Sequence, residues 1–256
     1  MVALSVNINK IALIRNSRAG NYPDLIEYAR QCIALGADGI TVHPRPDQRH
    51  IRATDIPELK NLLVAFPRIE FNIEGNPFAC GTGSYPGFMA LVEQSRPQQC
   101  TLVPDTDTQL TSDHGFDLRK DGKQLEPVIR QLQEWGCRVS LFMDPDCGQI
   151  SLAKEIGADR IELYTGPYAE AYANNDFDMT DKQLTAHAKA SAHAHALGMG
   201  VNAGHDLNLH NLPTLLVALP VLEEVSIGHA LTVDALYSGL AATIAAYKKI
   251  LNKDTH

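Results

Sequence analysis

Short runs of mostly apolar, β-branched residues alternate with longer amphipathic stretches along the whole chain. The eight predicted strands cover residues 4–8, 39–43, 70–75, 99–105, 138–144, 160–166, 200–204 and 224–228. The predicted helices include residues 24–35, 55–65, 125–135, 149–156, 180–197 and 233–250. Such alternation implies parallel strands joined by crossover helices. Because the eight units follow one another without a linker, the pattern favours one α/β domain over residues 1–256, a closed (β/α)8 TIM barrel.

An open, doubly wound sheet is the main rival to the closed barrel. Neither GxGxxG nor GxxxxGK[ST] follows the first predicted strand, so the usual nucleotide-binding form of that sheet lacks its best marker. A short echo supports a repeated helix–strand joint, because GADG at 36–39 and GADR at 157–160 each precede a predicted strand.

Composition and charge exclude several classes of partner. The chain is 45% hydrophobic and 20% charged, which is typical of a protein with a packed core. Its net charge of −8 and its lack of basic runs argue against a nucleic-acid or anionic-membrane binder. No stretch reaches the roughly 18 apolar residues needed to cross a bilayer. The five cysteines are odd in number and form no CxxC pair, so we expect free thiols in a cytoplasmic protein without an export signal.

Polar residues gather where the predicted strands end, which is where barrel enzymes place their active sites. The residues at or just after these ends are Asn7, Asn9, Lys10, Arg18, His43, Arg45, His50, Glu74, His205, Asp206, Gly228 and His229, and Glu162 lies within the sixth predicted strand. An unpaired buried charge costs several kcal/mol, so charged groups at these places need either a partner or a function. Any single one of them could still be a cap or a salt-bridge member.

The histidines divide into two groups. His43, His205 and His229 lie at strand ends, whereas residues 187, 193 and 195 lie in a polar helical stretch and are expected on the surface. Neither HxH nor HExxH occurs, and carboxylates nearby are sparse, so a catalytic metal is not favoured. Acid–base chemistry fits better, since histidine titrates near neutrality and burial of Glu74 or Glu162 would raise its pKa toward that range.

Phosphate recognition has separate support in the arginines and in the last strand. Arg18, Arg45 and Arg49 can present planar donor forks to anions. The segment SIGHAL at 226–231 leads from the eighth predicted strand into a short helix, where Gly228 would let the backbone approach a phosphate. A plain strand–helix turn is the alternative interpretation.

Several segments, in the same order, resemble the pyridoxine 5'-phosphate synthase family over nearly the whole chain. They are VNINKIALIRNSR at 6–18, GADGITVHPRPDQRHI at 36–51, FNIEG at 71–75, LVPD at 102–105, VSLFMD at 139–144, IELYTGPYA at 161–169, VNAGHDLNLHN at 201–211 and SIGHAL at 226–231. The resemblance implies a (β/α)8 barrel without metal or organic cofactor. It implies condensation of 1-deoxy-D-xylulose 5-phosphate with 3-amino-2-oxopropyl phosphate, giving pyridoxine 5'-phosphate, phosphate and water.

The same resemblance implies a role for each matching residue. His43 and His205 match two proton-transferring histidines, Glu74 matches a carboxylate base, and Glu162 matches a glutamate that stabilises charged intermediates. The implied substrate contacts are Asn7 and Arg18 for the aminoketone phosphate, Arg45, His50 and Thr111 for the deoxyxylulose phosphate, and the phosphate-proximal pair Gly228 and His229. A loop at residues 106–116 is expected to close over the substrates. The resemblance further implies a homo-oligomer, often an octamer.

The chain departs from the commonest family pattern at three of the candidate binding positions. Asn9 and Lys10 stand where many members have Asp and His, and Asp206 stands where many have Gly. These changes touch the deoxyxylulose pocket, where Lys10 could replace an imidazole as a donor. Two alternatives therefore stay open, namely an aldolase forming a Schiff base on Lys10 and a phosphate-binding paralogue without activity.

Overall fold

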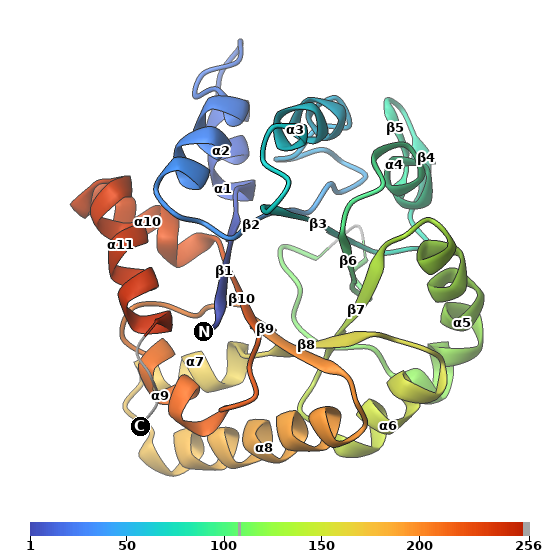
Figure 1. Cartoon of the computed structure of the whole chain (residues 1–256), viewed down its shortest axis with the longest axis vertical. Helices are drawn as coiled ribbons and strands as arrows, with labels where there is room; N and C mark the ends of the chain where they lie inside the picture. The colour runs from blue at the N-terminus through green and yellow to red at the C-terminus, as the bar shows by residue number, and fades with distance from the viewer. Residues whose placement is uncertain (107–108, 253–256) are drawn as a thin grey trace.

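The computed structural model, which describes residues 1–106 and 109–252, contains the closed parallel barrel that the sequence predicts. The barrel order is β1-β10-β9-β8-β7-β6-β3-β2, and helices surround it (Figure 1). Its strands are β1 (Ala3–Asn7), β2 (Gly39–Val42), β3 (Glu70–Gly75), β6 (Gln99–Leu102), β7 (Arg138–Met143), β8 (Arg160–Tyr164), β9 (Gly200–Gly204) and β10 (Glu224–Ile227). The predicted fold class is confirmed.

The helices differ in places from the hydrophobic pattern. They are α1 (Asn9–Asn16), α2 (Leu25–Ala34), α3 (Asp55–Val64), α4 (Phe88–Ser95), α5 (Leu118–Glu134), α6 (Cys147–Glu155), α7 (Gly166–Ala173), α8 (Phe177–Ala196), α9 (Leu212–Ala218), α10 (His229–Ser238) and α11 (Leu240–Leu251). The single helix expected at 233–250 is wrong, because Gly239 adopts φ 80 and separates α10 from α11. A small antiparallel hairpin of β4 (Cys80–Thr82) and β5 (Tyr85–Gly87) was not expected from its short, glycine-rich sequence.

The repeated GAD joint has a physical role at two strand starts. The Asp38 carboxylate accepts a hydrogen bond from the Leu4 backbone N–H at 2.8 Å, and Asp159 accepts one from Val139 N–H at 2.8 Å. Each aspartate follows a helix and accepts a hydrogen bond from the backbone N–H of the second residue of the neighbouring strand. The echo in the sequence therefore marks two equivalent joints at the amino end of the barrel.

The barrel interior is polar, although the layer between strands and helices is apolar. Ser5 and Thr41 share a hydrogen bond of 2.7 Å, Asn72 Nδ2 donates to Thr41 Oγ1 at 3.3 Å, and Thr101 Oγ1 donates to Asn72 Oδ1 at 3.2 Å. All four of these side chains are buried. Such a lining offers hydrogen-bonding partners that lower the cost of placing carboxyl groups inside the barrel.

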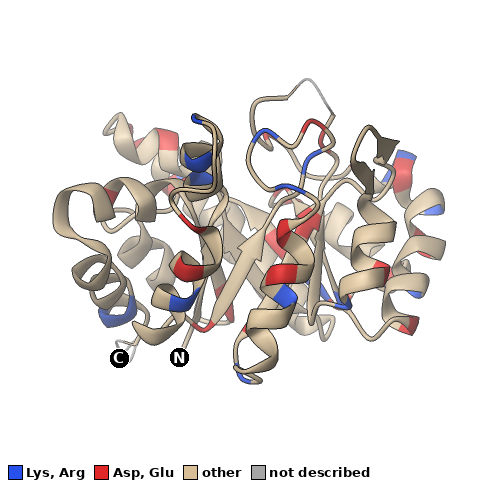
Figure 2. Cartoon of the chain, turned by 90° about the horizontal axis from the view of Figure 1, so that it is seen from above, with Lys and Arg blue, Asp and Glu red and all other residues tan. Residues whose placement is uncertain are grey.

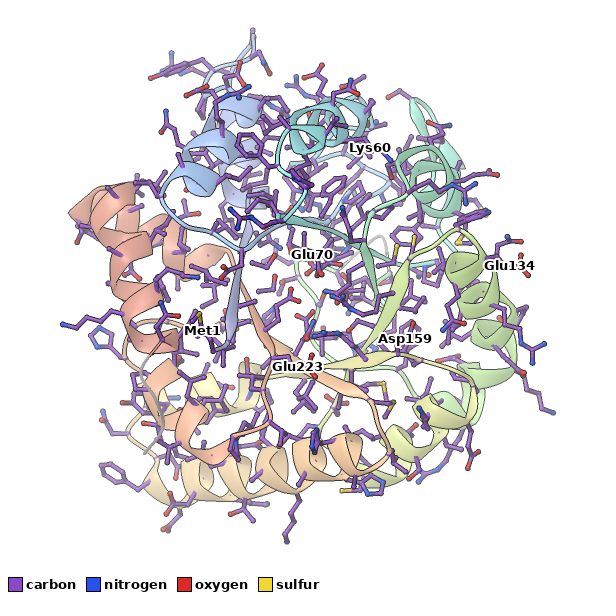
Figure 3. The ribbon with its side chains drawn as sticks, in the orientation of Figure 1. Met1, Lys60, Glu70, Glu134, Asp159 and Glu223 are labelled. Atoms are coloured by element: carbon purple, nitrogen blue, oxygen red, sulfur yellow. The ribbon has the colours of Figure 1, made fainter. Side chains whose placement is uncertain are left out.

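Ion pairs close the amino end of the barrel. Arg138 bonds Glu70 at 2.6 Å and Gln99 Oε1 at 2.7 Å, and Arg160 bonds Glu223 at 2.6 Å. The labelled Glu70 and Glu223 lie around the barrel opening in Figure 3, whereas Glu134 lies outside, on α5. Charged groups at this end are thus engaged with one another, which leaves the opposite end for substrate chemistry.

Candidate active site

The carboxyl ends of the strands form the candidate active site. Figure 2 shows basic and acidic residues together on the loops at the end of the barrel opposite the N-terminus. His43 follows β2, Glu74 lies near the end of β3, and Asp105 follows β6, and all three side chains are buried. Parallel neighbours β2, β3 and β6 therefore bring three titratable groups to one place.

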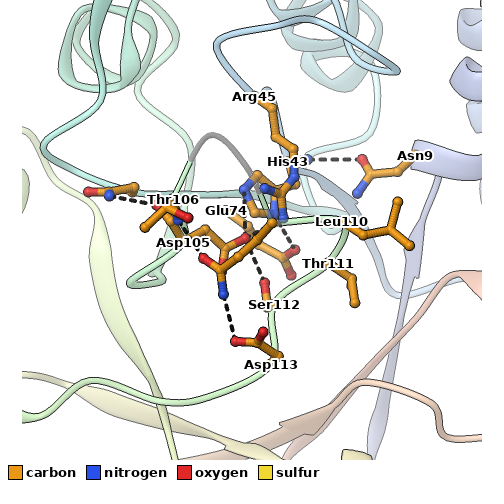
Figure 4. A network of polar contacts seen from close by, with 12 residues as sticks. Asn9, His43, Arg45, Glu74, Asp105, Thr106, Leu110, Thr111, Ser112 and Asp113 are labelled. Atoms are coloured by element: carbon orange, nitrogen blue, oxygen red, sulfur yellow. Dashed lines mark hydrogen bonds and ion pairs between the residues drawn. The ribbon is translucent and has the colours of Figure 1, made fainter.

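His43 lies between two carboxyl groups (Figure 4). Its Nδ1 is 3.9 Å from Glu74 Oε2, and its Nε2 is 3.8 Å from Asp105 Oδ2. Its backbone N–H donates to Asn9 Oδ1 at 3.0 Å, and the Asn9 N–H donates to Asn7 Oδ1 at 3.0 Å. Burial, helped by the positive charge of Arg45, holds the pKa of His43 well below its usual range. The imidazole is therefore neutral at neutral pH.

The Glu74 carboxyl group has a higher pKa than that of an ordinary surface glutamate. Burial raises its pKa to about 8, and the negative charges of Asp105 and Glu224 contribute to the rise. Weak hydrogen bonds come from Asn7 Nδ2 to Oε2 and from Ser226 Oγ to Oε1, both at 3.4 Å. At neutral pH this carboxyl group holds a proton beside a neutral histidine, so the pair contains one acid and one base.

Glu162 projects from β8 into the barrel and is 4% exposed. Burial first, and then the charge of Glu74, raises its pKa well above the usual value. Its Oε2 has no hydrogen-bond partner among the described residues. Gly204 on β9 provides the space for it, because a β-carbon at that position would come within 2.2 Å of Glu162 Oε1.

Arg45 and Asp105 form a buried ion pair, and only Arg45 was predicted from the sequence as a site residue. Arg45 donates to Asp105 Oδ2, and Ser112 Oγ donates to the same oxygen at 2.9 Å. Asp105 thereby joins a cation, the His43 ring and the loop after β6 (Figure 4). The aspartate was missed because an acid after Pro104 at a strand end is typical of a turn, although it closes the LVPD segment.

His50 is held as a neutral donor on the same side of the site. Its Nδ1 accepts the Ile51 N–H at 2.9 Å, which leaves Nε2 to carry the proton. Burial and the charges of Arg45 and Arg49 lower its pKa to about 3. The surrounding segment is fixed by Arg15, which makes a buried pair with Asp55 at 2.7 Å and donates to the His50 carbonyl at 3.0 Å.

A second cluster stands on the loop after β9. His205 Nδ1 lies 2.8 Å from Asp206 Oδ2, and its Nε2 lies 2.9 Å from Thr111 Oγ1. The Asp206 pKa is lowered, first by the hydrogen bond with His205 and further by the charges of His229 and Lys10. The Lys10 charge also contributes to the lowered pKa of His50, after burial and the charges of Arg45 and Arg49.

Comparisons with known proteins show the family of the chain. Residues 4–253 match the family described as "Pyridoxal phosphate biosynthesis protein PdxJ". The chain belongs to the PdxJ family. A protein of Xanthomonas campestris named "Pyridoxine 5'-phosphate synthase" is 56% identical over 248 residues, covering 97% of this chain and 95% of the relative. One of Xylella fastidiosa with the same name is 52% identical over 249 residues, covering 97% and 94%.

Solved structures show the fold alone, because their sequences are distant. The BexX/CysO complex of Amycolatopsis orientalis aligns with a TM-score of 0.59 at 16% identity, covering 98% of this chain and 90% of that one. The family resemblance inferred from the sequence segments is confirmed by the family match itself.

Most site residues expected of a PdxJ family member lie together at the carboxyl end, and one stands apart. Gly228 contacts Asn7 closely, since a β-carbon there would lie 3.0 Å from Asn7 Cβ, and His229 begins α10. Arg18 is exposed beyond the end of α1, and its side chain has no polar partner in the described part of the chain. The loop expected at 106–116 includes residues 107 and 108, which lie outside the described residues.

The surface placement expected for the helical histidines is partly wrong. His195 is exposed and His193 is half-buried, but His187 is fully buried with its ring nitrogens 2.8 Å from the Gln183 carbonyl oxygen and 3.0 Å from that of Tyr164. Across residues 1–106 and 109–252, no three His, Cys, Asp or Glu side chains are grouped as metal ligands. No helix within those ranges is long and apolar enough to cross a membrane.

Proposed function

We propose that this PdxJ family member is a pyridoxine 5'-phosphate synthase. The reaction joins 1-deoxy-D-xylulose 5-phosphate to 3-amino-2-oxopropyl phosphate, closing a pyridine ring with loss of phosphate and water. The observation that carries the proposal is the buried set of acids and bases at one end of the barrel. Neutral His43 and protonated Glu74 lie 3.9 Å apart, with Glu162 deeper in the barrel.

Several proton transfers of different kinds are needed for this condensation. Imine formation, enolisation, elimination and ring closure each move a proton, so groups with different protonation states must reach the same intermediate. Neutral His43 accepts a proton, and Glu74 donates one or, once ionised, withdraws one from carbon. Burial raises the pKa of Glu162 and favours its neutral form, and a nearby cationic intermediate such as an iminium would favour the ionised form that stabilises it.

Two anion-binding regions support two phosphorylated substrates. One lies at the N-terminus of α10, where Gly228 approaches Asn7 and no side chain caps the first backbone N–H groups of the helix. The other includes the neutral donor His50, whose pKa is lowered by burial and then by the charges of Arg45, Arg49 and Lys10. We assign the aminoketone phosphate contacts to Asn7 and Arg18, and the deoxyxylulose phosphate contacts to Arg45, His50 and Thr111.

Product formation tests the proposal directly. The two substrates are mixed with the wild-type protein, and pyridoxine 5'-phosphate is detected by mass spectrometry together with released phosphate. We expect product from wild type and a loss of about 10²–10⁴-fold in His43→Asn and Glu74→Gln, with folding preserved. Glu155→Gln, an exposed change on α6, is the matched control. Tight phosphate binding without product would instead support an inactive binder, and borohydride trapping at Lys10 would support an aldolase.

A cytoplasmic homo-oligomer, up to an octamer, is part of the same proposal. Large apolar side chains stand exposed on two contacting helices, with Leu13 and Ile14 on α1 and Leu236 and Tyr237 on α10. Leu236 is 73% and Tyr237 88% exposed, which is unusual for neighbouring large apolar residues and typical of a contact between copies. Light scattering of wild type and of Leu236→Asp would test it, a smaller particle being expected for the variant.

A further inference from the structure

Two consecutive residues after β9 adopt the left-handed backbone conformation. His205 has φ 82 and Asp206 has φ 60. Residues with a β-carbon avoid this region because the β-carbon comes too close to the backbone oxygen. Such a conformation persists only where the surrounding structure holds it, and it is concentrated at functional sites.

Buried polar side chains hold this turn at both of its carbonyl groups. Thr165 Oγ1 donates to the carbonyl oxygens of Gly204 at 2.7 Å and His205 at 2.5 Å. Asn211 Nδ2 donates to the Asp206 carbonyl oxygen at 3.1 Å. Thr165 is fully buried and Asn211 is 1% exposed, so the anchors are themselves fixed. These buried side chains therefore hold the strained turn in place.

The turn places a carboxylate on one nitrogen of the candidate catalytic ring. Asp206 Oδ2 lies 2.8 Å from His205 Nδ1, and Tyr164 meets the ring edge-on with centroids 5.2 Å apart. An ionised carboxylate only accepts hydrogen bonds, so Nδ1 must carry the proton. In the neutral ring Nε2 is then the acceptor, and Thr111 Oγ1 donates to it at 2.9 Å.

We propose that Asp206 is a positioning residue, whose carboxylate holds the His205 ring with its proton on Nδ1 and with Nε2 as the unprotonated acceptor. The proposal rests on the proposed function for the identity of the reaction. When Nε2 takes a proton from a substrate, the adjacent carboxylate compensates the new positive charge without moving. The hydrogen bond with His205, and then the charges of His229 and Lys10, lower the pKa of Asp206, so the carboxylate stays ionised.

Asp206→Gly separates this role from a structural one. A purely structural residue would lower both stability and activity when replaced, whereas here we expect the unfolding temperature to rise and kcat to fall. Glycine relieves the left-handed backbone, so we expect the unfolding temperature to rise by about 2–4 °C. Loss of the carboxylate should lower kcat on the order of 10²-fold with little change in KM. Asn175→Gly is the matched control, since Asn175 is exposed, has φ 54 and lies on the turn between α7 and α8, with no part in the site. It should be as active as wild type.

The tautomer of His205 provides a readout that does not depend on turnover. Nitrogen-15 shifts of ring-labelled protein, assigned by subtraction of a His205→Asn sample, should show a protonated Nδ1 in wild type and a mixture of tautomers in Asp206→Gly. Asp206→Asn, which keeps an acceptor oxygen, should restore part of both the tautomer preference and kcat. Wild-type kcat in Asp206→Gly, or an unchanged tautomer, would overturn the proposal. Absence of product in wild type would overturn the proposed function while the tautomer test stands.

Discussion

Nδ1 of His43 lies 3.9 Å from Oε2 of Glu74, and both side chains are buried at the carboxyl end of the barrel. Burial favours the uncharged form of each, which means a deprotonated imidazole beside a protonated carboxyl group. The two groups are thus poised for opposite tasks before substrate arrives.

Activity should rise with pH through the titration of Glu74. Its pKa is raised to about 8, so a step that needs the ionised carboxylate gains as pH passes through that region. We expect kcat/KM to increase between about pH 7 and 9, measured by phosphate release. Glu155→Gln should give a profile that superimposes on wild type. A rising limb that ends below pH 6 would show that Glu74 does not act as the base in the limiting step.

Folding stability should change with pH in the opposite direction. The folded pKa of Glu74 is about 8 and the ordinary value is 4.5, so the folded state binds the extra proton between these values. The free energy of unfolding therefore falls as pH rises from 4.5 toward 8, and the contribution of this group is lost above its folded pKa. Urea unfolding of Glu74→Gln should show a shallower decline, by up to about 1.4 kcal/mol per pH unit.

The matched surface change Glu155→Gln should leave that slope as it is in wild type. Glu224, whose pKa is also raised to about 8, keeps part of the decline in the Glu74 variant. Equal slopes in wild type and Glu74→Gln would mean that the Glu74 carboxyl group titrates alike in the folded and unfolded chain.

Asp105→Asn should destabilise the fold by leaving Arg45 without its counter-charge. Both side chains are about 95% buried, and removing one member of such a pair typically costs about 3–5 kcal/mol. Asp47→Asn, which breaks an exposed pair with Arg49, should cost about 1 kcal/mol or less. Inorganic phosphate should raise the unfolding temperature of Asp105→Asn more than that of wild type, because the anion replaces the lost charge. An equal phosphate effect would place the anion away from Arg45.

The positions of the strand ends could be predicted from the sequence, but most side-chain contacts between the segments that follow them could not. His43 and Glu74 could be predicted as neighbours because parallel strands carry their last residues to one face. The ion pair between Asp105 and Arg45 joins residues 60 positions apart in the sequence. Both residues lie in loops, which have no periodic pattern from which such a contact could be predicted. His187 was misplaced because its neighbours are alanines and polar residues, while the carbonyl that receives its ring belongs to β8. Contacts of this kind depend on packing between distant segments.

Gly204→Ala should lower activity while the barrel stays folded. A β-carbon at this position would come within 2.2 Å of Glu162 Oε1 and 3.3 Å of the Ser226 carbonyl oxygen, so the glutamate must rotate away. Since Glu162 is buried, its displaced carboxyl group can no longer meet a cationic intermediate, and we expect kcat to fall on the order of 10²-fold.

Gly122→Ala in α5 is the matched control for the added methyl group. Its β-carbon would meet Ile156 Cγ2 at an ordinary 3.7 Å, and alanine favours a helix interior by roughly 1 kcal/mol over glycine. That variant should be fully active and slightly more stable. If Gly204→Ala kept wild-type kcat with an unchanged circular dichroism spectrum, Glu162 would not need its present position for the reaction. If Gly204→Ala lost both activity and spectrum, the space beside Glu162 would instead be a requirement of folding.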